Sequence, residues 1–86
     1  MYYTYILQSE KDGKLYIGQT NDVFRRLERH NTGQIRATRY RKPFIILCYK
    51  EFETRKESMQ MEKYLKSLKG GNEFKKILQQ WGVAKR

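Results

Sequence analysis

The chain has 86 residues, of which 33 % are charged and 14 % aromatic, and its 19 lysines and arginines against 9 acidic residues give a net charge of +10. This length predicts one domain over residues 1–86 and excludes two, and no apolar run approaches the ~20 residues of a membrane-spanning helix. We expect a polyanionic partner, because each cationic side chain placed on a phosphate releases condensed counterions; a basic protein without a partner is the plainer alternative.

The first elements form a predicted β-hairpin. Tyr2 to Gln8 is aromatic and β-branched, Asp12-Gly13 is a turn signal, and Leu15 to Gly18 predicts the returning strand. In an antiparallel pair, the side chains of two opposite residues point to the same face of the sheet. If the loop is symmetric about Asp12-Gly13, the numbers of opposite residues add up to an odd constant, so an odd-numbered residue of the first strand lies opposite an even-numbered residue of the second. One face of the sheet is therefore expected to carry Tyr3, Tyr5, Tyr16 and the gap left by Gly18. Taken alone, these tyrosines could equally be core residues.

A helix is expected to follow, capped by Thr20 or Asn21, running to about Asn31 and ending at Gly33. Apolar residues at helical spacing predict which of its side chains are buried. The predicted buried residues are Val23, Phe24 and Leu27.

Arg26 and His30 flank this predicted apolar stripe and should point toward the margin of the sheet. An arginine at the rim of a cleft can bind a phosphate through two hydrogen bonds. Arg25 and Arg29 lie further round the helix, where a solvated basic face is expected. A lone helical histidine is more often a surface residue than a functional one.

The middle of the chain predicts a basic loop and a third strand. Gln34 to Lys42 is polar and carries Arg36 and Arg39, whereas Phe44 to Phe52 is an apolar run typical of a strand covered on both faces. Cys48 lies inside this run, has no partner for a disulfide, and is predicted to be a buried structural thiol.

The last third predicts two helices. Thr54-Arg55-Lys56-Glu57 is a capping box that starts the first helix, and Gly70-Gly71 ends it. Asn72 is expected to cap the last helix, with a loose tail from Val83 to Arg86. The apolar positions are Met61, Leu65 and Leu68, then Phe74, Ile77, Leu78 and Trp81. The element order strand, strand, helix, strand, helix, helix predicts an α+β domain.

Glu62 lies at the edge of the apolar stripe of the first of these helices. A carboxylate facing a basic cleft suits Mg²⁺, which takes one or two protein carboxylates and completes its shell with water and phosphate oxygens. The alternative is an ordinary ion pair with Lys66 at i,i+4 spacing, worth about 0.3–0.5 kcal/mol.

An ordered series of residues runs through the chain. It begins with Leu15-Tyr16-Ile17-Gly18-Gln19-Thr20 and continues through Arg26 and His30 to Glu57-Ser58, Glu62 and Lys66. From Tyr2 to about Leu78 this series resembles the GIY-YIG nuclease superfamily. It is most similar to the small single-domain members related to the N-terminal nuclease domain of the excision-repair endonuclease. The first half of the motif reads Tyr3-Thr4-Tyr5, without the family's glycine and isoleucine.

The resemblance implies a three-stranded antiparallel sheet flanked by helices, and cleavage of DNA with a single divalent ion, Mg²⁺ or Mn²⁺. It implies that Tyr5 and Tyr16 lie near the attacking water, Arg26 contacts the scissile phosphate, His30 assists proton movement, and Glu62 binds the metal. Residues expected along the bound DNA are Gly18, Arg36, Arg39, Lys66 and Asn72.

Three functions follow from these features. A metal-dependent endonuclease, acting on a repair intermediate, a branched structure or plain duplex, uses the tyrosines, Arg26 and Glu62 together. A non-catalytic nucleic-acid-binding module needs only the basic loop and exposed aromatic residues for base stacking, and a protein-interaction domain could retain the fold. We expect the nuclease to be a cytoplasmic monomer in a reducing compartment, with DNA and a targeting protein as partners and no membrane.

Overall fold

The computed structural model describes residues 1–82, and the predicted tail Val83–Arg86 lies outside the described residues. Its elements in chain order are β1 (Tyr2–Ser9), β2 (Leu15–Thr20), α1 (Val23–Asn31), the 3-10 helix η1 (Arg36–Thr38), β3 (Phe44–Phe52), α2 (Arg55–Ser67) and α3 (Asn72–Gln80). The expected α+β class and order of strands and helices are confirmed. The 3-10 turn is an addition inside the predicted basic loop.

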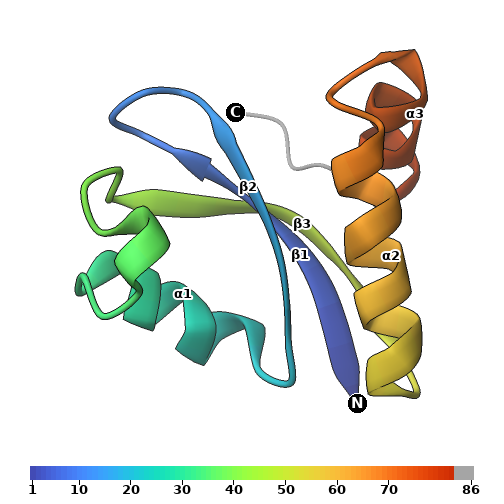
Figure 1. The fold of residues 1–86 in the computed structure, drawn as a ribbon, viewed down its shortest axis with the longest axis horizontal. Coiled ribbons are helices and arrows are strands. Elements are labelled where there is room, and N and C mark those ends of the chain that lie inside the picture. The colour runs from blue at the N-terminus through green and yellow to red at the C-terminus, as the bar shows by residue number, and fades with distance from the viewer. Residues whose placement is uncertain (83–86) are drawn as a thin grey trace.

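The strands form one antiparallel sheet in the order β2-β1-β3. Helix α1 lies against one face of this sheet, and α2 and α3 lie on the other side (Figure 1). The molecule is therefore a sheet between two unequal layers of helix, with β1 in the centre.

The hairpin register brings Tyr5 opposite Gly18. Its loop has four residues, Glu10 to Gly13, closed by a hydrogen bond from the amide of Ser9 to the carbonyl of Lys14 at 2.9 Å. The loop is centred one residue earlier than the Asp12-Gly13 turn signal suggests. Paired residue numbers nevertheless keep an odd sum, so the predicted shared face is confirmed.

Two hydrophobic clusters lie on opposite faces of the sheet, because successive side chains of β1 alternate between them. The cluster under α2 and α3 consists of the buried residues Ile6, Cys48, Leu65, Phe74 and Ile77. The cluster under α1 consists of Tyr5, Leu7, Val23 and Phe44. Cys48 is 5 % exposed, as expected, and burial raises the pKa of its thiol to about 11.

The apolar run of β3 lies on an edge strand. A register shift opposite Ile6 and Leu7 leaves Leu47 as an extra residue, a β-bulge. Ile46 packs against the cluster under α1, whereas Leu47 and Cys48 belong with the cluster under α2 and α3. Both faces of the strand are thus covered, as the continuous apolar run predicts.

Two predicted helix caps are wrong. Asp22, rather than Thr20 or Asn21, caps α1, and its carboxylate accepts the backbone amide of Arg25 at 3.1 Å. Thr20 stays in β2, which moves the start of the helix further along the chain. At α3 the extended N-cap residue is Gly71, so Asn72 is already helical and makes no capping hydrogen bond. The capping box of Thr54 and Glu57 on α2 is confirmed.

The buried stripe of α1 also differs from the prediction. Phe24 is 66 % exposed, and its ring packs edge-on against Tyr49 with centroids 6.2 Å apart. His30 is fully buried instead, so the helix contacts the sheet through Val23, Leu27 and His30. This set follows the i, i+4, i+7 spacing of one helix face, which leaves Phe24 to one side.

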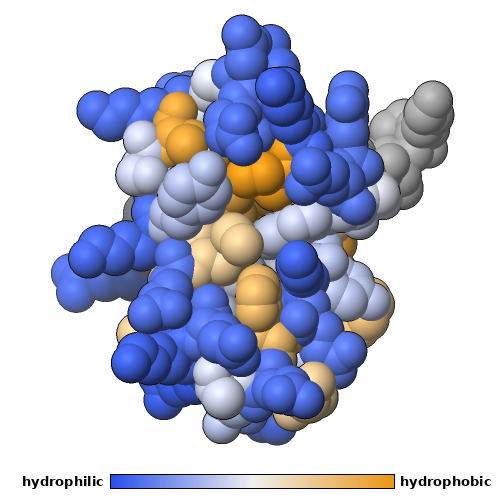
Figure 2. All heavy atoms as spheres, turned by 90° about the vertical axis from the view of Figure 1, so that its right-hand side faces the viewer, coloured by the Kyte–Doolittle hydropathy of each residue, from blue (hydrophilic) through white to orange (hydrophobic). Residues whose placement is uncertain are grey.

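Hydrophilic side chains cover most of the face that carries α2 and α3, with apolar residues visible between them (Figure 2). Met59 and Tyr64 of α2 are the large apolar side chains with substantial exposure there, at 49 % and 44 %. Within residues 1–82, no helix combines the length and apolar character that crossing a bilayer requires.

The two caps provide a paired test of these assignments. We expect Thr54→Ala to lower the free energy of unfolding by about 1 kcal/mol, because it removes the hydroxyl oxygen that accepts the backbone amide of Glu57. Asn72→Ala should change it by less than about 0.5 kcal/mol, because no cap is lost. Urea unfolding followed by circular dichroism measures both, and an equal cost for the two variants would contradict the assignment.

Candidate active site

The hydroxyl group of Tyr5 is a junction between the sheet and α1. Its oxygen lies 3.1 Å from Nε2 of His30 and accepts a hydrogen bond from Nε of Arg26 at 3.4 Å. The tyrosine is only 1 % exposed, whereas Arg26 is half-buried and reaches the surface. The central strand therefore holds an arginine at the surface through a buried phenol.

Gly18 makes room for this phenol. A Cβ atom added at this position would overlap the hydroxyl group and the adjacent ring carbon of Tyr5. Tyr16 completes the aromatic group, with ring centroids 6.4 Å from Tyr5 and 5.0 Å from His30. Gly18 thus acts through the space that it leaves beneath the Tyr5 hydroxyl.

His30 is held from both sides in the interior. Its Nδ1 lies 2.7 Å from Oγ1 of Thr38, which belongs to η1, and its Nε2 faces Tyr5. Burial, followed by the charges of Arg26 and Arg29, lowers the pKa of His30 to about 4. The imidazole is neutral near pH 7 and is not the surface residue that a lone helical histidine suggests.

Thr38 is a site residue that the sequence does not reveal. It is fully buried, and its hydroxyl group meets His30 across eight positions of chain. It lies in a polar, basic segment whose composition predicts an open loop, and no periodicity there signals a buried threonine. Only the folded loop brings it under α1.

The electrostatic environment of Tyr5 connects the junction to Glu62. Burial raises the pKa of the Tyr5 hydroxyl, the hydrogen bond and charge of Arg26 lower it, and Tyr16 and Glu62 raise it. The carboxylate of α2 is therefore close enough to act on the phenol, although the two come from elements far apart in the sequence.

Glu62 and Lys66 form the ion pair expected from their spacing, with Nζ 2.7 Å from Oε2. The Glu62 side chain is only 23 % exposed, against 55 % for Lys66. Lys66 and Tyr16 together line a shallow hollow of about 480 Å³ between β2 and α2. Lys66 thus lies beside Tyr16 at the β2 edge of the sheet, and Glu62 is bonded to it.

The donor set around Glu62 limits which metal ion fits. Within residues 1–82 there is no group of three or more histidine, cysteine, aspartate or glutamate side chains that could hold a metal. A cage built entirely from protein ligands, as structural zinc requires, is not available there. One carboxylate does fit Mg²⁺, which keeps several waters and takes substrate phosphate oxygens.

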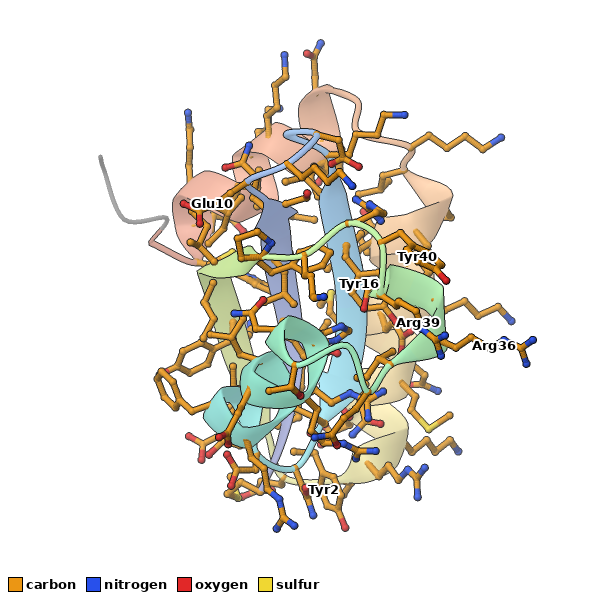
Figure 3. All side chains as sticks on the ribbon, turned by 90° about the vertical axis from the view of Figure 1, so that its left-hand side faces the viewer. Tyr2, Glu10, Tyr16, Arg36, Arg39 and Tyr40 are labelled. Atoms are coloured by element: carbon orange, nitrogen blue, oxygen red, sulfur yellow. The ribbon has the colours of Figure 1, made fainter. Side chains whose placement is uncertain are left out.

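The basic loop divides into exposed and structural arginines. Arg36 and Arg39 are exposed, and the guanidinium of Arg39 lies 5.8 Å from the ring centroid of Tyr40, which is 76 % exposed. Arg41 instead pairs with Asp12 at 3.0 Å and ties the loop to the hairpin. Figure 3 looks onto this loop, from which Arg36 points outward.

The predicted site residues fall into three groups. Tyr5, Tyr16, Arg26 and His30 meet around Gly18, and the pair of Glu62 and Lys66 lies at the neighbouring edge. Arg36 and Arg39 stand apart on the loop. Asn72 is exposed at the start of α3 and makes no side-chain hydrogen bond to the other groups in the described part of the chain.

Comparison with known proteins gives a consistent result. The family model described as the GIY-YIG catalytic domain matches residues 1–76. A UPF0213 protein of Bacillus licheniformis is 44 % identical over 78 residues, 88 % of this chain and 78 % of that protein. A UPF0213 protein of Oceanobacillus iheyensis is 43 % identical over 68 residues, 78 % of each chain.

A solved structure is similar over nearly the whole chain. The solution NMR structure of a UPF0213 protein from Bacillus halodurans aligns with a TM-score of 0.57 at 34 % identity, covering 98 % of this chain and 88 % of that one. The names of these relatives state no activity, so the comparison bears on family and fold.

The lowered pKa of His30 makes stability depend on pH. The unfolded chain has a histidine pKa of about 6.5, so the folded state favours the neutral ring. This stabilisation is complete above pH 6.5 and is lost as the pH falls toward the folded pKa of about 4. We expect the wild type to lose roughly 2 kcal/mol between pH 7 and pH 5 from this group.

Urea unfolding at the two pH values measures this loss, with His30→Gln as the comparison that should lose less. Imidazole chemical shifts from NMR give the pKa directly. A ring that titrates near its ordinary value would overturn the assignment.

The overlap at Gly18 gives a second test. We expect Gly18→Ala to destabilise the fold by about 1–3 kcal/mol, because the buried Tyr5 ring must move away from the new methyl group. Gly71→Ser is the comparison, because a Cβ there meets only ordinary contacts, the backbone φ is −73°, and serine is at least as good an N-cap residue as glycine. Equal unfolding free energies for the two variants would show that Tyr5 does not depend on the space at Gly18.

Proposed function

This chain belongs to the GIY-YIG family, and we propose that it is a metal-dependent endonuclease that hydrolyses phosphodiester bonds in DNA. The observation that carries the proposal is the hydrogen-bonded junction of Arg26, Tyr5 and His30 beside the carboxylate of Glu62. It combines a cation for the phosphate, groups that can hold or accept a proton, and one hard oxygen ligand.

The residues that meet the substrate in this proposal are the accessible ones: Tyr16, Arg26 and Glu62, each half-buried. The guanidinium of Arg26 binds the scissile phosphate and neutralises the charge that develops as water adds to phosphorus. Within the described residues, the Tyr16 hydroxyl has no hydrogen-bond partner, so it is free to orient the attacking water.

Tyr5 and His30 act one layer below. Tyr5 fixes Arg26 through its hydroxyl oxygen, and the hydroxyl proton of Tyr5 can shift to Nε2 of neutral His30, which lies within hydrogen-bond distance. Arg26 and Arg29 help to keep the pKa of His30 low in the free protein. Bound phosphates offset those positive charges, so substrate raises the capacity of His30 to take the proton.

Glu62 is the residue that would hold the ion, Mg²⁺ or Mn²⁺, together with water and phosphate oxygens. When bound, such an ion withdraws charge from the phosphate and stabilises the leaving oxygen as its bond to phosphorus breaks. Lys66 neutralises the Glu62 carboxylate in the free protein, and with that carboxylate on an ion its ammonium group would be available to the DNA backbone.

The basic loop supplies general affinity for DNA through Arg36 and Arg39, with no feature that selects a sequence. We infer that a targeting partner chooses among repair intermediates, branched structures and plain duplex. Asn72, which lies apart from the junction, is not assigned a role in this reaction.

The decisive experiment measures cleavage of nicked, branched and duplex DNA with Mg²⁺ or Mn²⁺. We expect the wild type to cut, and Glu62→Gln or EDTA to reduce the rate by at least about 100-fold, because the ion loses its protein ligand. Glu53→Gln is the matched control, because Glu53 is an exposed carboxylate between β3 and α2.

Cleavage by Glu62→Gln at the wild-type rate would sink the assignment of the metal ligand. Salt-sensitive DNA binding without any cleavage would favour the non-catalytic binding module. Neither binding nor cleavage would point to the protein-interaction domain.

A further inference from the structure

A second hollow lies on the far side of Arg26 from the Tyr5 junction. It has a volume of about 670 Å³ and is walled by α1 on one side and by the first residue of α2 on the other. Four of its lining residues are arginines: Arg25, Arg26, Arg29 and Arg55. Arg26 is the one residue that this hollow shares with the junction described above.

The arginines of this hollow outnumber its acidic residues, four against two. None of the four forms an ion pair within residues 1–82, where the ion pairs are those of Arg41 with Asp12 and Lys66 with Glu62. Asp22 and Glu28 also line the hollow, but Asp22 is occupied as the cap of α1. Positive charges gathered in one concavity raise the local potential, and an anion relieves their mutual repulsion.

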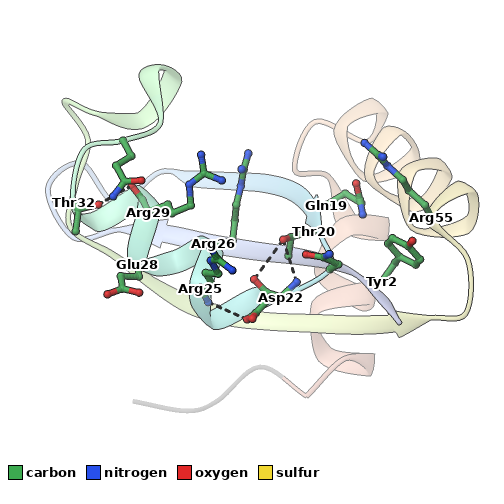
Figure 4. A pocket seen from close by; sticks show the side chains of 12 residues that line it. Tyr2, Gln19, Thr20, Asp22, Arg25, Arg26, Glu28, Arg29, Thr32 and Arg55 are labelled. Carbon is green, nitrogen blue, oxygen red and sulfur yellow. Dashed lines mark hydrogen bonds between the residues drawn. The ribbon is translucent and has the colours of Figure 1, made fainter.

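The arrangement suits a chain of phosphates rather than one. Arg26 and Arg29 are one helical turn apart, a spacing of about 5–6 Å between Cβ atoms, and both side chains rise on the same side of α1 (Figure 4). Arg55 stands on the opposite wall, with Gln19 between the two walls. Amide and hydroxyl groups on the floor can donate hydrogen bonds to phosphate and sugar oxygens.

We propose that this hollow binds the phosphates on either side of the scissile one on the same strand, which passes from Arg29 past Arg26 to Arg55. The inference rests on the proposed nuclease function, which puts the scissile phosphate at Arg26. It also revises the expectation that Arg29 belongs to a plain solvated face. A free phosphate ion offers the same chemistry as a strand, and the two sources are separable by experiment.

The test is DNA binding in EDTA, so that cleavage does not enter. Fluorescence anisotropy of a short labelled duplex is measured over a series of salt concentrations for the wild type, Arg29→Gln and Arg55→Gln. Each variant removes one phosphate contact, so the slope of log affinity against log salt should fall in magnitude by about 0.9. Affinity at the lowest salt should fall several-fold.

Lys76→Gln is the matched control, because Lys76 is an exposed cation on α3, across the sheet from the hollow. If all three variants change the slope alike, the hollow is ordinary surface charge and the inference is wrong. If inorganic phosphate shifts the NMR signals of Arg29 and Arg55 while both variants bind DNA like the wild type, the site takes a free anion and the strand assignment is overturned. If the wild type itself fails to bind, the proposed function is what fails.

Discussion

β1 hydrogen-bonds to β2 along one edge and to β3 along the other, so its alternating side chains must serve both helical layers. Ile6 supports α2 and α3, whereas Tyr5 and Leu7 support α1. A one-residue slip of this strand would exchange the two faces and place Tyr5 under α2. The register of the hairpin is therefore the constraint on which the position of every site residue depends.

The layer under α1 is a core made partly of polar groups. Tyr5, His30 and Thr38 are buried, and within residues 1–82 no buried side-chain nitrogen or oxygen lacks a partner. Such a network is stable only when it is fully connected, and its geometry is then narrowly defined. The half-buried Arg26 is hydrogen-bonded to this network and is held in one position. A charged group fixed in advance stabilises developing charge without having to reorganise.

The sequence predicts the elements well because each leaves a local signal: alternation in the strands, a capping box at Thr54, and apolar spacing in α2 and α3. The odd sum of paired residue numbers in the hairpin is enough to place Tyr5, Tyr16 and Gly18 on the same face of the sheet. Long-range packing decides the rest, including the exposure of Phe24, the burial of Thr38 and the position of Arg55 opposite α1 across one hollow. No local pattern encodes these contacts.

The departure from the family motif at Thr4 has a similar tertiary explanation. Its side chain points away from the site and donates a buried hydrogen bond of 2.7 Å to the carbonyl of Ser58. The position that the family fills with isoleucine thus joins β1 to α2 through a polar contact. Tyr5, the tyrosine of the motif, points to the opposite face of the sheet, under α1, and does not contact this hydrogen bond.

Trp81, the single tryptophan of the chain, packs against the cluster under α2 and α3 and has the whole sheet between it and the cluster under α1. The tyrosines of the site lie in that second cluster. Intrinsic fluorescence excited at the red edge of the indole band therefore reports on one layer alone, whereas the assigned ring signals of Tyr5 and Tyr16 in NMR spectra report on the other. Following both signals during denaturation would show whether the two layers unfold together or one after the other.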